Sequence, residues 1–150
     1  MKTKLLLLGV ALNLWGQGTL LTNASVSITF LHQQASAASH PGASAANGIH
    51  RAARLGVPPS ELPVVDSTAT LFVSQEKALA QEARQYHAGI RASNQTPDIL
   101  KVKSFTARRE ALATAAMANL QRTISAAGFA GLQRYLATDL RASMIVQNAK

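Results

Sequence analysis

Apolar residues recur through the middle of the chain at alternating steps of three and four positions. The first series has Glu76 as its one charged member and consists of Leu62, Val65, Ala69, Phe72, Glu76, Leu79, Ala83, Tyr86 and Ile90. The second series consists of Ile99, Val102, Phe105, Leu112, Ala116 and Leu120. A repeat of about 3.5 residues is the pattern of a helix packed lengthwise against another helix. The two series therefore predict two long helices that pack together.

The link between these helices is short and polar. Residues 93–96 read Ser-Asn-Gln-Thr, and Pro97 and Asp98 follow. Thr96 is expected to cap the second helix, with Pro97 in the first helical position and Asp98 near the positive end of the helix dipole. Such a short link favours a long antiparallel helical hairpin.

One register of this hairpin places large residues opposite large ones, with Tyr86 near Phe105 and Leu79 near Leu112. The charged seam positions Glu76 and Arg109 then fall opposite Ala116 and Ala83. Arg109 is also expected to reach Glu82 across the edge of the seam. Glu76 has two interpretations: a polar residue that fixes the register, or a solvated side chain at the edge of a thin interface. The second is favoured, because an alanine-rich seam leaves room for a charged side chain.

Shorter helices are predicted on both sides of the hairpin. Asn47 could cap a short helix that Gly56 ends, and Ser60 is expected to cap the first long helix after the break at residues 57–60. Ser125 is expected to cap a third helix with one apolar face, formed by Phe129, Leu132, Leu136 and Leu140. The predicted fold is all-α: a long antiparallel hairpin, a short N-terminal helix and a third C-terminal helix packed near the open end. Residues 143–150 carry no clear signal.

The N-terminus has the organisation of a signal peptide. Residues 1–4 are basic, residues 5–12 are apolar, and small residues that suit a signal peptidase precede Ala38 and Ser25. We expect a signal peptide over 1–37, cleaved after Ala37 or failing that after Ala24, a flexible linker over 38–48 and a helical domain over 49–150. The protein is then exported, to the periplasm or the medium. The alternative is an uncleaved membrane anchor.

Charge is the main clue to partners. The chain has a formal net charge of +8 and no cysteine, so disulfides and cysteine chemistry are excluded. Loss of residues 1–37 would leave 13 basic and 7 acidic residues, a net charge of +6. Positive charge favours a protein client or an anionic surface as partner. No specific nucleic-acid binding is expected, because aromatic residues are not interleaved with the basic ones. Membrane contact is expected only if the N-terminal segment stays uncleaved.

Candidate chemistry is sparse. None of the histidines (His32, His40, His50 and His87) pairs with another ligand at helical spacing. Cleavage after Ala37 would expose Ala38-Ser39-His40, whose amine, backbone nitrogens and imidazole suit Cu(II) or Ni(II). Ser74 and Lys77 match the S-x-x-K motif of penicillin-recognising enzymes, but its companion motifs are missing. We therefore assign no catalytic, cofactor-binding or metal residues and expect no enzyme activity.

Residues 124–128, with Leu132 and Tyr135 after them, carry one limited resemblance. With its capping Ser125 this string is similar to the L-T-x-x-Q motif in periplasmic Spy-like chaperones, but the leucine, threonine and glutamine of that motif are all replaced. The resemblance implies a concave helical surface that holds clients. The expected function is an exported, non-enzymatic interaction or chaperone-like module. The alternatives are an envelope-associated structural protein and, less favoured, a copper- or nickel-binding factor.

Overall fold

The structure, a computed structural model, describes residues 23–40 and 45–148. All regular elements in these ranges are helical, which confirms the predicted all-α class. In chain order they are α2 (Asn23–Ser39), α3 (Ala45–Leu55), the 3-10 turn η1 (Pro59–Glu61), α4 (Leu62–Ala92), α5 (Ile99–Thr123), α6 (Ala126–Tyr135), the π-helical turn η2 (Leu136–Leu140) and α7 (Arg141–Asn148).

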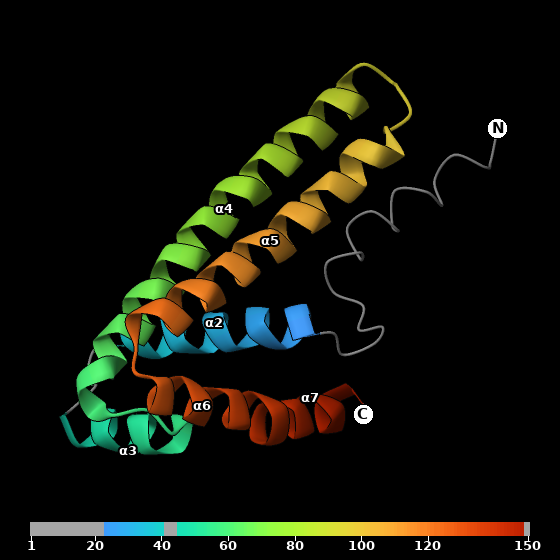
Figure 1. The fold of residues 1–150 in the computed structure, drawn as a ribbon. Coiled ribbons are helices and arrows are strands. Elements are labelled where there is room, and N and C mark those ends of the chain that lie inside the picture. The colour runs from blue at the N-terminus through green and yellow to red at the C-terminus, as the bar shows by residue number, and fades with distance from the viewer. Residues whose placement is uncertain (1–22, 41–44, 149–150) are drawn as a thin grey trace.

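The longest helices, α4 and α5, lie side by side and contact each other (Figure 1). Helix α2 crosses their lower part and packs against both. On the other side of α2 lie α6, η2 and α7, which follow one another as a single rod (Figure 1). We call the region where α2 packs against α4 and α5, together with α3, α6, η2 and α7, the base. The upper parts of α4 and α5 extend beyond it. We call residues 74–92 of α4 and 99–113 of α5 the arm.

The start of α5 lies slightly later than predicted. Asp98, not Thr96, is the N-cap, and its carboxylate accepts a hydrogen bond from the backbone N–H of Leu100 at 2.8 Å. Pro97 therefore precedes the cap instead of occupying the first helical position. A carboxylate so close to the first free amides both accepts their hydrogen bonds and meets the positive end of the helix dipole.

Two further predicted caps need correction. The turn η1 intervenes before α4, so Glu61 and not Ser60 precedes its first residue. Helix α3 begins at Ala45, so Asn47 lies inside it. Its predicted end at Gly56 is confirmed, because Gly56 has φ +69° and its N–H donates to the carbonyl of Ala53 at 3.1 Å. A left-handed glycine of this kind ends a helix without steric cost.

The connection into α6 depends on close backbone approach. Ser125 is its N-cap, as predicted, and accepts a hydrogen bond from the N–H of Gly128 at 3.0 Å. A Cβ on Gly131 would meet the carbonyl oxygen of Gly56 at 1.9 Å, so glycine is needed for α6 to approach the end of α3. After α6 the chain forms η2 and then α7, which gives residues 141–148 a helical structure that the sequence did not signal.

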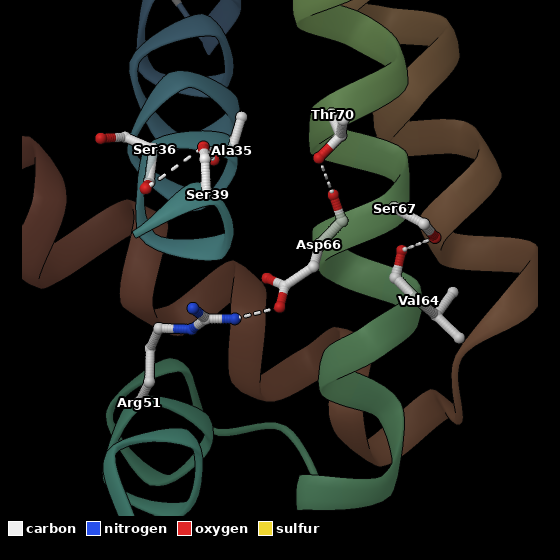
Figure 2. A network of polar contacts seen from close by, with 8 residues as sticks. All are labelled: Ala35, Ser36, Ser39, Arg51, Val64, Asp66, Ser67 and Thr70. Carbon is white, nitrogen blue, oxygen red and sulfur yellow. Dashed lines mark hydrogen bonds and ion pairs between the residues drawn. The ribbon is translucent and has the colours of Figure 1, made fainter. Parts of the chain in front are cut away.

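The hydrophobic core has two parts. The main core fills the base and joins α2, α3, α4, α5, α6 and η2. A small second core in the arm consists of Leu79, Ala83 and Phe105, with Tyr86 and Leu112 packed against it. At the base, Arg51 of α3 donates to Asp66 of α4, which fixes the short helix to the long one (Figure 2).

Helix α2 is the largest difference from the sequence prediction. The expected signal peptide (1–37) and linker (38–48) cover all of α2 and the start of α3. Residues 1–22 lie outside the described part of the chain. Within the predicted linker, residues 38–39 end α2 and residues 45–48 begin α3. The side chains of Phe30 and Leu31 are fully buried, so α2 contributes directly to the main core.

Candidate functional site

A polar junction joins three helices where the arm meets the base. Glu76 of α4 is only 7% exposed. Its Oε1 lies 2.5 Å from Nε of Arg109 on α5, and its Oε2 lies 2.6 Å from Nε2 of His32 on α2. The histidine ring also packs edge-on against Phe72, with centroids 5.8 Å apart. The carboxylate therefore has a partner from each neighbouring helix.

This environment changes the acidity of Glu76. Burial by itself raises the pKa, but the hydrogen bonds from His32 and Arg109 and their positive charge outweigh it, so the pKa is lowered. The interpretation of Glu76 as a solvated edge residue is therefore wrong. Its burial and pairing agree with the other interpretation, a polar residue within the seam.

A second polar cluster lies on the surface of the arm. Arg108 of α5 donates two hydrogen bonds to the carboxylate of Glu82 on α4, each at 2.8 Å. Lys101 lies 3.6 Å from the same carboxylate. The hydrogen bond from Arg108 lowers the pKa of Glu82 and raises that of Arg108. The predicted Glu82–Arg109 pair is thus wrong, because Arg109 turns inward to Glu76 and Arg108 takes its place.

An open groove of about 490 Å³ lies between α4 and α5 beside this cluster. Its apolar lining combines small and large side chains from the two helices: Ala78, Leu79, Ala111 and Leu112. Gln75, Glu82 and Arg108 supply the polar part of its lining. The groove is therefore apolar with a charged border, which suits a partner that is itself amphipathic.

The tip of the arm exposes apolar side chains among basic ones. Ile99 is 67% exposed and Leu100 is 76% exposed. Between residues 84 and 108 there is one acid, Asp98, against five basic residues: Arg84, Arg91, Lys101, Lys103 and Arg108. Neighbouring exposed apolar side chains of this kind make the tip a candidate contact site.

Side-chain contacts hold this tip in place. The hydroxyl of Tyr86 accepts a hydrogen bond from the backbone N–H of Asp98 at 2.8 Å. The Tyr86 and Phe105 rings lie 5.9 Å apart, and the ammonium group of Lys101 lies 5.3 Å from the Phe105 ring centre. The sequence pattern placed Ile99 in the second seam, but the structure exposes it, and the pattern did not single out Leu100.

Other candidate motifs are not brought together. Ala38 and Ser39 lie in α2, where backbone amides serve the helix, and the ring of His40 lies 2.7 Å from the carbonyl of Ser36. Ser74 and Lys77 are both exposed on α4. Across residues 23–40 and 45–148, no three histidine, aspartate or glutamate side chains gather closely enough to hold a metal ion. Within the same ranges, no helix has both the length and the apolar character to cross a bilayer.

Comparison of the chain with protein-family models, with curated proteins and with solved structures finds no match.

Proposed function

We propose that the protein is a non-enzymatic binding module whose arm forms a helical hairpin and holds an acidic, amphipathic segment of a protein client. The exposed pair Ile99 and Leu100, set among basic side chains at the tip of the arm, is the observation that carries the proposal. Burial of two large exposed apolar side chains favours association, and the surrounding positive charge selects an acidic partner.

The architecture of the arm supports a helical partner. Near the base, α2 covers the α4–α5 pair, whereas the separate second core of the arm has just three buried members, Leu79, Ala83 and Phe105. Two packed helices bury little apolar surface, and most helical stability in proteins comes from packing of such a face. A third helix laid in the open groove would extend the three-helix packing of the base along the arm.

Charge argues against a second copy of this chain as the occupant. Pairing of two arms would bring together two surfaces that each carry five basic residues and one acid between residues 84 and 108. Like charges across an interface are unfavourable, whereas an acidic client would neutralise them. The client therefore differs from the chain itself in the sign of its charge.

A binding titration tests this proposal. A labelled amphipathic peptide with glutamates on one face and leucines on the other should bind the full chain and raise its fluorescence anisotropy. Binding should weaken as salt is added, because exposed charges are screened. A peptide with lysines in place of the glutamates is the matched control and should not bind.

Variants at the tip and at the base separate a specific site from general attraction. Leu100→Ser and the pair Lys101→Glu with Lys103→Glu should each weaken binding by about ten-fold or more. Leu71→Ser and Arg122→Glu change exposed residues outside the arm and should leave affinity within about two-fold. Equal effects at tip and base would overturn the proposal, as would binding to anionic phosphatidylglycerol vesicles but not to the acidic peptide.

We also propose that the module acts after export. The basic and apolar pattern of residues 1–12 supports this placement. Because α2 belongs to the core, cleavage after Ala24 leaves a chain that keeps the buried residues of α2, whereas cleavage after Ala37 removes them.

A further inference from the structure

A second hollow lies on the other side of α2, away from the arm. It is a cleft of about 820 Å³ between α2 and the stretch that runs from the end of α6 to the start of α7. Its polar lining comes from α2, α3, α6, η2 and α7 and includes His32, Gln34, His40, Arg54, Tyr135 and Asp139. The cleft is at least as open to solvent as the groove of the arm.

Gln34 is the unusual residue of this cleft. It is only 1% exposed, and its carbonyl oxygen Oε1 is buried without a hydrogen-bond partner. Its neighbours on the buried side of α2 are apolar, including Phe30 and Leu31. A buried acceptor without a donor costs free energy, so an apolar residue would serve the core better. Because Gln34 lines the cleft and its Oε1 has no donor, this oxygen is suited to accept a hydrogen bond from a ligand.

The opposite wall is shaped by the π-helical turn η2. This wider turn follows Tyr135 directly and covers residues 136–140. Within it, Leu140 is buried in the main core while Asp139 lines the cleft and stays exposed. Single π-helical turns inside helices occur frequently at functional sites, because the extra residue redirects side chains.

The cleft carries charges of both signs. The guanidinium of Arg54 lies 5.8 Å from the ring centre of Tyr135, which is itself held edge-on against Phe30 at 6.5 Å. Asp139 accepts a hydrogen bond from the hydroxyl of Thr138 at 3.0 Å, and as a carboxylate it has further acceptor capacity. A ligand with one charge only would meet a like charge in this cleft.

We propose that the cleft binds a small zwitterion of the amino-acid type, either a free amino acid or a dipeptide. Its ammonium group donates to Oε1 of Gln34 and to the carboxylate of Asp139. Its carboxylate accepts from the guanidinium of Arg54, for which a planar two-oxygen partner is well matched. The two hollows share no lining residue, and they come nearest to each other through His32, which lines this cleft and contacts Glu76 of the arm.

The test is an NMR titration of the full chain with the standard amino acids and glycylglycine. At least one of them should shift the backbone amide signals of residues 34, 54 and 139 in a saturable way at about 10 mM or below. For that compound, the N-acetylated form lacks the ammonium group and the amide form lacks the carboxylate. Each should bind about ten-fold more weakly or worse, because each leaves a polar group of the site unpaired.

Two variants and a control complete the test. Gln34→Leu removes the buried acceptor and should reduce affinity about ten-fold or more, while its thermal unfolding midpoint stays equal or rises. Arg54→Gln changes an exposed residue that should not be needed for folding, and it should reduce affinity in the same way. Gln121→Leu on the exposed surface of α5 should bind as the wild type does. Absence of saturable binding across the panel would overturn the proposal, as would wild-type affinity in both Gln34→Leu and Arg54→Gln.

Discussion

Glu76 and Arg109 form a largely buried ion pair between α4 and α5, with the carboxylate oxygen 2.5 Å from the guanidinium Nε. The pair lies in the seam between the two long helices, at the point where α2 adds His32 to the same carboxylate. Removal of one member of a buried pair leaves the other charge without its partner, which is far more costly than loss of a surface pair.

Replacement of Glu76 should therefore destabilise the fold. We expect Glu76→Gln to lower the free energy of unfolding by about 1–3 kcal/mol, because the buried carboxylate would lose its charge-assisted contacts with Arg109 and His32. Urea denaturation followed by circular dichroism measures this change. Glu110→Gln removes an exposed glutamate from α5 and serves as control, with an expected change within about 0.5 kcal/mol. Equal losses in the two variants would show that the junction does not stabilise the fold.

The same junction predicts a pH dependence. The pKa of Glu76 is lowered from its ordinary value of 4.5, despite burial, by hydrogen bonds from His32 and Arg109. The unfolded chain therefore takes up the proton first as pH falls. The contribution of Glu76 to stability is complete above pH 4.5 and is lost as pH falls through the lower folded-state pKa. Unfolding free energies measured across this range should fall more steeply for the wild type than for Glu76→Gln. Parallel curves would contradict the prediction.

Two glycine-to-alanine substitutions should change the stability of the fold in opposite directions. Gly131→Ala should be strongly destabilising, because its Cβ would meet the backbone of Gly56 at 1.9 Å. Gly89→Ala should stabilise α4 by about 0.5–1 kcal/mol, because nothing lies within 4 Å of the added Cβ and alanine favours a helix. Thermal unfolding midpoints should move in opposite directions. A shift of the same sign in both would show that the α3–α6 approach is not as tight as described.

The core of the arm makes a prediction about local stability. Leu79 is buried between the two long helices, whereas Leu112 is half-buried. Leu79→Ala should cost about 2–4 kcal/mol, and Leu112→Ala should cost less because it leaves a smaller buried cavity. Amide hydrogen exchange should show the largest loss of protection in the arm for both variants, since the base has its own core. Uniform loss across the chain would mean that arm and base unfold as one unit.

The role of α2 can be tested with two chains of different length. A chain that begins at Ser25 keeps the buried residues Phe30 and Leu31 and should unfold cooperatively. A chain that begins at Ala38 lacks them and should lose cooperative unfolding, because the main core would be left open. If residues 1–24 are an export signal, N-terminal sequencing of the exported protein should find Ser25. Cooperative unfolding of the chain that begins at Ala38 would contradict this role of α2 and would support the predicted signal peptide over residues 1–37.

The predictions that the structure confirms rest on patterns that are local in the sequence. The all-α class follows from the apolar repeat of single helices, and the caps at Gly56 and Ser125 follow from short stretches around each residue. Helix α2 was missed because its apolar residues continue the apolar N-terminal segment and resemble part of a signal peptide. Membership of a core cannot be read from such a run alone.

The candidate sites were harder to predict. Glu76 was visible as a charged seam residue, but its partners come from helices far away in the sequence. The long arginine side chain at 109 reaches along the seam, so pairing by opposite position misassigned it to Glu82. Gln34 gave no signal, because a single glutamine in an apolar helix becomes informative only when its burial is known.

The most direct test of the proposed function is to map where an acidic amphipathic peptide contacts the full chain. Amide chemical shifts of the isotope-labelled protein should change mainly at residues 84–108 and along the groove beside Leu79 and Leu112, while α3 and α6 stay unchanged. The Leu100→Ser variant should lose these changes, and Leu71→Ser should keep them. Changes confined to the base, or no saturable changes with the acidic peptide, would contradict the proposal that the arm is the binding surface.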